Sequence, residues 1–226
     1  MSEYIIETTK VNRYFPIAGG DDFHALKNIS IQVPSLSLSI LRGRSGSGKT
    51  TLMNILGALD RPTNGTVIFD GKDITRLTDR QRDKLRRKNI GFIFQAVSLI
   101  PNMTAYENVE FSLRLANYKG DKKERVTECL KLVGLASRMH HMPHELSGGE
   151  QQRVAIARAI AHRPMVIFAD EPTAELDTNT ALSVMKIFKE LVEKEKITIV
   201  MTTHDTMLMS AADYIFHMED GEIVDE

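Results

Sequence analysis

The clearest chemical spacing in the sequence is that of Gly43–Thr50, which reads Gly-Arg-Ser-Gly-Ser-Gly-Lys-Thr and matches a phosphate-binding loop. Glycine lacks a Cβ, so the backbone N–H groups of such a loop can turn inward around phosphate oxygens. Lys49 would bring a positive charge to the phosphates, and the Thr50 hydroxyl can ligate Mg²⁺. The candidate phosphate-binding residues are Gly43, Arg44, Ser45, Gly46, Ser47, Gly48, Lys49, Thr50 and Thr51.

A second candidate phosphate site lies far along the chain, in the segment 146–152 (Leu-Ser-Gly-Gly-Glu-Gln-Gln). Ser147 and Glu150 have the spacing of a capping box, in which the two side chains close a helix start reciprocally. Gly148 and Gly149 leave the N–H groups of that first turn uncovered, and such a helix start binds anions. One nucleotide does not need both devices from one subunit, so the second one points to a nucleotide shared between two copies.

Two carboxylates follow the apolar run 165–169, namely Asp170 and Glu171. A run that is apolar on both faces is typical of a buried parallel strand, and α/β sheets hold ligands at the carboxyl ends of their strands. Asp170 suits Mg²⁺, and Glu171 suits a general base or a water-orienting group. An isolated Asp-Glu pair is more often a simple strand-end turn, and a lone histidine such as His204 after 197–203 is more often structural. For the two carboxylates, the presence of a phosphate-binding loop in the same chain favours a functional role over a simple turn.

The hydrophobic pattern predicts strands that alternate with helices, and therefore an α/β protein with a parallel sheet. The expected strands are 4–11, 24–33, 35–41, 165–169 and 197–203, with a β-hairpin at 66–71. The expected helices are 52–59, 78–88 and 178–194, and 101–161 is expected to be mostly helical. Thr78 and Gln81 have the spacing of a further capping box.

Composition narrows the function classes. The chain has 226 residues, of which 42% are hydrophobic and 26% charged, as in globular α/β proteins. A formal net charge of −1 gives no sign of a nucleic-acid partner. The single cysteine, Cys129, excludes an intrachain disulfide and suits a reducing compartment. Neither a signal peptide nor an apolar run of about 18 residues is present, so we expect that any function at a membrane depends on a partner protein.

From Tyr14 to Gly221 the chain resembles the ATP-binding cassette (ABC) ATPases. Gly43–Thr50 resembles the Walker A motif, 165–171 resembles Walker B, and 146–152 resembles the signature motif. The remaining matches are Gln95 in the Q-loop, 174–177 in the D-loop, the switch histidine His204, and Tyr14, where the family stacks an aromatic ring on adenine. The resemblance implies ATP and Mg²⁺ as ligands.

The same resemblance implies roles for individual residues. Lys49, Gln95, Glu171 and His204 would be catalytic, and Thr50, Gln95 and Asp170 would hold Mg²⁺. Tyr14 would contact the nucleotide of its own subunit, and Ser147, Gly148, Gly149 and Glu150 would contact that of a second. The implied fold is a P-loop NTPase, here a single ABC domain over 1–226. Its RecA-like parallel core and antiparallel β-subdomain cover 1–94 and 164–226, and a helical signature subdomain covers 95–163.

Within the family, the segments 54–63, 91–95 and 107–109 resemble the lipoprotein-release and macrolide-export branch. The implied function is that of an ATPase subunit that dimerises around two ATP molecules. It would drive a separately encoded permease acting on a peptide, lipid, antibiotic or lipoprotein, from the cytoplasmic face of the membrane. A non-transport regulatory ATPase, as in cell-division control, is the alternative. Three positions depart from the branch: Ala174-Glu175 replace its usual Gly-Asn, 34–37 replaces a Gly-Glu turn, and Arg44 replaces a common proline.

Overall fold

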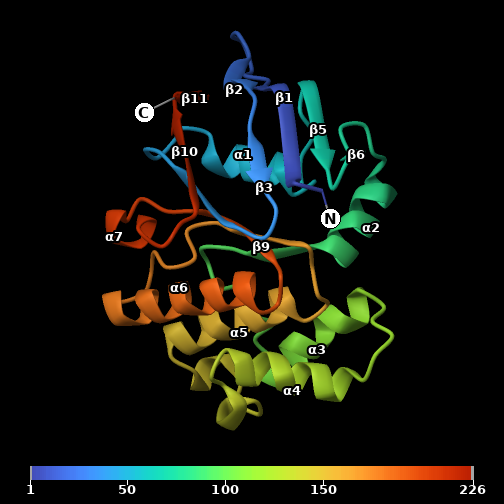
Figure 1. Cartoon of the computed structure of the whole chain (residues 1–226), viewed down its shortest axis with the longest axis vertical. Coiled ribbons are helices and arrows are strands. Elements are labelled where there is room, and N and C mark those ends of the chain that lie inside the picture. Colours follow the sequence, from blue (N-terminus) through green and yellow to red (C-terminus); the bar gives the residue numbers. More distant parts are fainter. Residues whose placement is uncertain (1, 225–226) are drawn as a thin grey trace.

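A six-stranded sheet forms the centre of the computed structural model, which describes residues 2–224 (Figure 1). Its order is β11 (Glu222–Val224), β10 (Tyr214–Glu219), β4 (Leu38–Arg42), β9 (Thr198–Thr202), β8 (Val166–Ala169) and β7 (Ile90–Ile93). Neighbouring strands from β10 to β7 run parallel, and β11 is antiparallel to β10. The carboxyl ends of the parallel strands therefore meet at one edge, where α/β sheets hold their ligands.

An antiparallel sheet lies in the upper part of Figure 1, to the right of β10 and β11. Its path is β2 (Phe23–Ile29), β1 (Tyr4–Phe15), β5 (Asn64–Phe69) and β6 (Lys72–Asp73), and β3 (Gln32–Pro34) also pairs with β1. The strand expected at 24–33 is thus two strands. Thr8 marks the break, because its hydroxyl donates to the Ile29 carbonyl at 3.2 Å and accepts from the Ile31 N–H at 2.9 Å. The hairpin expected at 66–71 is confirmed by β5 and β6.

Helices pack against both faces of the central sheet. They are α1 (Lys49–Leu56), α2 (Asp79–Asn89), α3 (Ala105–Leu115), α4 (Lys122–Leu132), α5 (Gly148–Ile160), α6 (Thr178–Glu193) and α7 (Thr206–Met209), with 3₁₀ turns η1 (Ala136–Arg138) and η2 (Pro143–Glu145). The prediction that 101–161 is mostly helical is confirmed. The capping box of Thr78 and Gln81 is also confirmed, at the start of α2.

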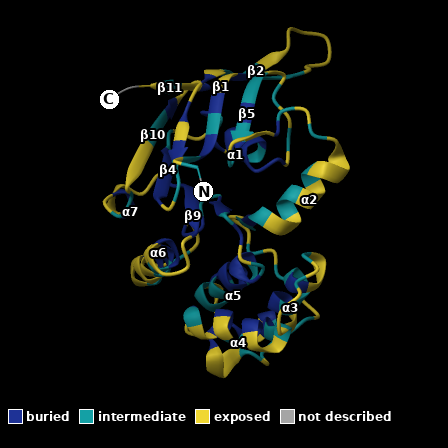
Figure 2. Cartoon of the chain, turned by 45° about the vertical axis from the view of Figure 1, so that its right-hand side comes forward, coloured by how far each residue is buried: buried dark blue, intermediate teal, exposed yellow. Residues whose placement is uncertain are grey.

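Strand β8 shows how one short run joins two hydrophobic clusters. Ile167 and Ala169 pack with residues of α3, α4, α5 and α6, whereas Val166 and Phe168 pack with α1 and the antiparallel sheet. Successive residues of a strand point to opposite faces, so this alternation requires an apolar residue at every position. In Figure 2 the buried residues accordingly gather in the central sheet and on the inner sides of the helices. The predicted buried strand at 165–169 is confirmed.

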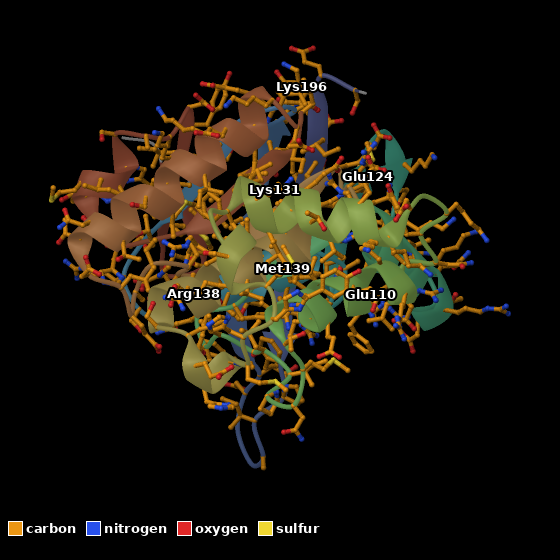
Figure 3. The ribbon with its side chains drawn as sticks, turned by 90° about the horizontal axis from the view of Figure 1, so that it is seen from below. Glu110, Glu124, Lys131, Arg138, Met139 and Lys196 are labelled. Atoms are coloured by element: carbon orange, nitrogen blue, oxygen red, sulfur yellow. The ribbon has the colours of Figure 1, made fainter. Side chains whose placement is uncertain are left out.

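The outer surface of the helical layer carries charges of both signs. In the view from below (Figure 3), Glu110 projects from α3, Glu124 and Lys131 from α4, and Arg138 from the turn that follows. Within residues 2–224, no helix combines the length and the apolar character that crossing a membrane requires.

Candidate nucleotide-binding site

The phosphate-binding loop connects β4 to α1 and begins the site. Gly46 and Gly48 have φ angles of +82° and +98°, which residues with a Cβ rarely adopt. Lys49 is 7% exposed, and its Nζ donates to the carbonyl oxygens of Gly43 at 2.8 Å and Arg44 at 2.9 Å. The loop therefore holds the lysine ammonium group against its own backbone, next to the N-terminus of α1.

The buried part of this loop contains an unused polar group. The Ser47 hydroxyl oxygen is buried and has no hydrogen-bond partner among residues 2–224. A Cβ on Gly43 would lie 2.3 Å from the Met218 carbonyl oxygen and 2.6 Å from that hydroxyl. A loop that is packed against β10 on one side, with an unpaired hydroxyl inside, fits a ligand rich in hydrogen-bond acceptors such as a phosphate.

Three oxygen-bearing side chains meet beside the loop. Asp170, directly after β8, accepts a hydrogen bond from the Thr50 hydroxyl at 2.9 Å and one from the Thr202 hydroxyl at 2.7 Å. The Thr202 hydroxyl in turn accepts from the Glu171 N–H at 2.8 Å. Oxygen donors are the ligands that Mg²⁺ prefers, so Thr50 and Asp170 fit this ion. Sequence reasoning missed Thr202, although a hydroxyl inside the buried run 197–203 was a visible signal.

Glu171 and His204 face each other at the same edge. Glu171 has a φ angle of +43°, in the left-handed region, so the extended backbone of β8 does not continue through this residue. Its Oε1 lies 3.6 Å from Nδ1 of His204, which follows β9. The Glu171 side chain is 24% exposed and that of His204 is 71% exposed. The pair therefore presents an acceptor and an imidazole to solvent beside Asp170.

Two adjoining clefts expose these groups. The first, of about 400 Å³, brings together nine of the predicted residues and two unpredicted ones. Its lining is Ser45, Gly46, Gly48, Lys49, Thr50, Thr51, Gln95, Asp170 and Glu171, together with Phe23 and Ala25 from β2. The second, of about 550 Å³, is lined by Gly43, Arg44, Ser45, Ser47 and His204, and by residues of β10. The sequence-predicted P-loop and carboxylate residues therefore share one region.

The segment 146–152 lies on a different part of the chain. Ser147 caps α5: its hydroxyl accepts from the Glu150 N–H at 3.3 Å, and the Glu150 carboxylate accepts from the Ser147 N–H at 2.9 Å. The predicted capping box is confirmed. The Ser147 N–H also lowers the pKa of the Glu150 carboxyl, because it stabilises the charged form. Residues 147–150 line neither of the two clefts, so the chain presents its two phosphate devices on separate surfaces.

The two glycines of this helix start differ in their surroundings. A Cβ on Gly148 would meet no atom within 4 Å, so this residue faces open space. A Cβ on Gly149 would lie 2.6 Å from Cγ2 of Thr180, in the first turn of α6. Gly149 therefore allows α5 and α6 to approach closely, and Gly148 leaves the N–H groups of the helix start accessible.

Comparison with known proteins agrees with this arrangement. A model of the ABC transporter family matches residues 26–174, well over half of the 226 residues. The chain belongs to the ABC transporter family.

Similar ABC proteins come from several organisms. The lipoprotein-releasing system ATP-binding protein LolD of Syntrophotalea carbinolica is 43% identical over 220 residues, which are 97% of this chain and 96% of that protein. The macrolide export ATP-binding/permease protein MacB of Syntrophobacter fumaroxidans is 44% identical over 225 residues, which are 98% of this chain and 31% of that protein. A solved dimer of the ATP-binding cassette MJ0796, bound to ADP and Pi, is 39% identical and covers 97% of each chain with a TM-score of 0.89.

These similarities confirm the resemblance to the ABC ATPases and to their lipoprotein-release and macrolide-export branch. They also confirm the predicted fold class, an α/β ABC cassette with a parallel and an antiparallel sheet.

Tyr14, the expected adenine-stacking residue, contacts another ring of the β1–β2 pair. The Tyr14 ring stacks on His24, with centroids 4.0 Å apart, and Tyr14 lines neither cleft. Phe15 pairs with Phe23 across β1 and β2, and cross-strand partners share one face of a sheet. Since Phe23 lines the first cleft, the structure puts Phe15 and Phe23 on the face of the sheet opposite to that of Tyr14.

The signature helix of this ABC cassette also contacts two loops of the site. Gln152 is 2% exposed, and its Nε2 donates to the Pro172 carbonyl at 2.7 Å, directly after Glu171. Arg158 donates to the carbonyl of Ser98, in the loop that follows Gln95. Neither contact was predicted from the sequence, because each joins residues that are far apart in the chain.

Proposed function

We propose that this chain is an ATP-hydrolysing subunit of an ABC transporter complex that dimerises around two ATP molecules. The observation that carries the proposal is the separation of its two candidate phosphate-binding sites, the P-loop and the start of α5. The P-loop clefts contain no residue of 147–150, and the start of α5 opens to solvent at Gly148. A two-fold dimer would unite the two devices twice, once at each nucleotide. The dimeric MJ0796 cassette supports this assembly.

The residues of the clefts suit phosphoryl transfer to water. Lys49 and the loop N–H groups would stabilise charge on the transferring phosphoryl group. Glu171 would orient or deprotonate the attacking water, and His204, 3.6 Å away, would hold the terminal phosphate. Thr50, Asp170 and Gln95 would hold Mg²⁺, which supplies charge neutralisation on the phosphate oxygens when bound. Gln95 would also report the nucleotide state to the helices that follow it.

For the adenine base, Phe23 is a better candidate than Tyr14. Phe23 is 54% exposed and lines the cleft, whereas the Tyr14 ring is already stacked on His24. Stacking of a base on an aromatic ring contributes about 1–3 kcal/mol. We also propose that the chain has two parts. Residues 1–94 and 164–226 form a RecA-like core with its β-subdomain, and residues 95–163 form a helical signature subdomain.

The partner would be a separately encoded permease at the inner face of the cell membrane. Support comes from LolD, which is named an ATP-binding protein and matches this chain over nearly its whole length. The MacB relative is named an ATP-binding/permease protein. We therefore expect coupling of ATP hydrolysis to export or mechanotransmission, with a peptide, lipid, antibiotic or lipoprotein as substrate.

The decisive experiment is the variant Glu171→Gln, which keeps the side-chain volume but removes the carboxylate. With ATP and Mg²⁺ it should accumulate as a dimer in light scattering coupled to gel filtration, while ADP leaves it monomeric. The matched control is Glu171→Gln with Gly148→Asp, whose carboxylate would meet the phosphates of the shared nucleotide and should stay monomeric. If the single variant Glu171→Gln binds ATP and remains a monomer at every protein concentration, the proposal is overturned.

A further inference from the structure

Two exposed side chains of opposite charge stand at the loops of the site without a partner. Arg44 lies in the phosphate-binding loop, and Glu175 lies in the loop between β8 and α6. Within residues 2–224, neither side chain takes part in a hydrogen bond or an ion pair, although the Arg44 carbonyl accepts from Lys49. Charged side chains on a rigid loop beside a site can pair with a partner molecule.

The loop that carries Glu175 is held next to the signature turn of the same chain. Hydrogen bonds from the Ala174 N–H to the Glu171 carbonyl and from the Leu176 N–H to the Thr173 carbonyl fold it tightly. Asp177 then caps α6, and the Thr180 hydroxyl donates to its carboxylate at 2.6 Å. Thr180 is also the residue that packs against Gly149. Wherever the signature turn docks, the loop with Glu175 must dock beside it.

Arg44 lines the larger of the two clefts, together with His204. The cleft has mixed charge, because its lining includes Arg42 and Arg44 as well as Glu219 and Asp220. Arg44 is the charged residue of this lining that belongs to the exposed part of the phosphate-binding loop. A loop of a second molecule that covers the P-loop nucleotide would therefore pass close to its guanidinium group.

We propose that Glu175 forms an ion pair with the partner subunit's Arg44 across the nucleotide-bound dimer. The inference rests on the proposed dimer, because a signature turn that caps the partner's nucleotide brings residues 174–177 to the partner's P-loop. Two-fold symmetry makes the contact twice. The pair would favour the closed dimer of this chain over other pairings, since an unmatched charge at this position would oppose them.

The test is a double-mutant cycle in the Glu171→Gln background. The variants are Arg44→Ala, Glu175→Ala and both together, and the dimer dissociation constant is measured by analytical ultracentrifugation with saturating ATP and Mg²⁺. Close interfacial charge pairs strengthen binding by at least about tenfold, so two pairs predict about a hundredfold weaker dimer for each single variant. The double variant should be no weaker than either single one. Arg80→Ala and Glu193→Ala, which change exposed charges elsewhere, should have no effect.

Each outcome has a distinct meaning. Glu175→Ala should also bind nucleotide as a monomer with the affinity of the parent, measured with a fluorescent ATP analogue, and high salt should weaken the parent dimer more than this variant. If Arg44→Ala weakens the dimer while Glu175→Ala does not, Arg44 serves the nucleotide of its own subunit and the ion pair is refuted. Independent, additive effects also refute it. A parent variant that never dimerises instead refutes the proposed function, and the ion pair with it.

Discussion

The two glycines that start α5 should respond in opposite ways to the same added methyl group. In Gly149→Ala the new Cβ would lie 2.6 Å from Cγ2 of Thr180, whereas in Gly148→Ala it would meet nothing within 4 Å. Carbon atoms pack best at about 3.5–4.0 Å, so Thr180 or the helix must move by about 1 Å in the first variant. We expect Gly149→Ala to be the less stable of the two.

The difference between the two variants isolates the packing contribution. Replacing a helical glycine by alanine stabilises each variant by about 0.5–1 kcal/mol, and this gain largely cancels in the comparison. Overpacking costs about 1–3 kcal/mol, so the free energy of unfolding of Gly149→Ala should be lower than that of Gly148→Ala by about that amount. Thr180→Ser removes Cγ2 and keeps the hydroxyl that bonds Asp177, so it should restore most of the loss.

Urea unfolding of the nucleotide-free monomers measures these differences, since midpoints at an unchanged slope report stability. An ATP hydrolysis assay tests the other proposed role of this helix start, the contact with the partner's nucleotide. Gly148→Ala should remain stable but lose activity, because its methyl group occupies the surface proposed to face the partner's phosphate. Thr180→Ser should not rescue that variant. Equal stability of the two alanine variants, or a Gly149→Ala loss that Thr180→Ser leaves in place, would refute the packing argument.

Three other predictions follow from buried groups. Thr202→Val removes the hydroxyl that joins Asp170 to the Glu171 N–H, and it should lower the unfolding free energy by about 1–3 kcal/mol and the ATP turnover with it. Burial lowers the pKa of His162, so its stabilising contribution is complete above the unfolded pKa of about 6.5 and is lost as the pH falls below it. Urea unfolding from pH 7.5 to 5 should show this loss, and His162→Asn should reduce the slope. Burial raises the pKa of the Cys129 thiol to about 11, so an aromatic disulfide reagent at pH 8 should modify it only after unfolding.

The local signals of the sequence were sufficient for most elements. The capping boxes at Thr78 and Ser147 involve residues three positions apart, and they form as their spacing indicates. The strand at 165–169 was predictable because both of its faces are buried. Short or polar strands were not: Ile90–Ile93 is a brief run inside a motif, and the strands at 214–224 mix apolar and charged residues at the edge of the sheet.

The site was predictable where a motif names adjacent residues, and less so where folding joins distant ones. Thr202 lies 32 positions from Asp170, and only the parallel order of β8 and β9 brings them together. The position of Tyr14 depends on a register shift between Arg13 and Tyr14. A bulge of this kind changes which face a side chain occupies, and the spacing of the motif does not reveal it.

Helix α5 connects parts of the site that its motif does not mention. Its first turn carries the signature residues, Gln152 bonds the carbonyl after Glu171, and Arg158 bonds the loop after Gln95. A helix moves as one body, so a displacement of the signature turn must shift both hydrogen-bonded loops or break their contacts. In the proposed dimer the signature turn binds the partner's nucleotide. Each hydrolysis site would therefore respond to the nucleotide in the other through the buried Gln152 contact, rather than through the catalytic side chains themselves.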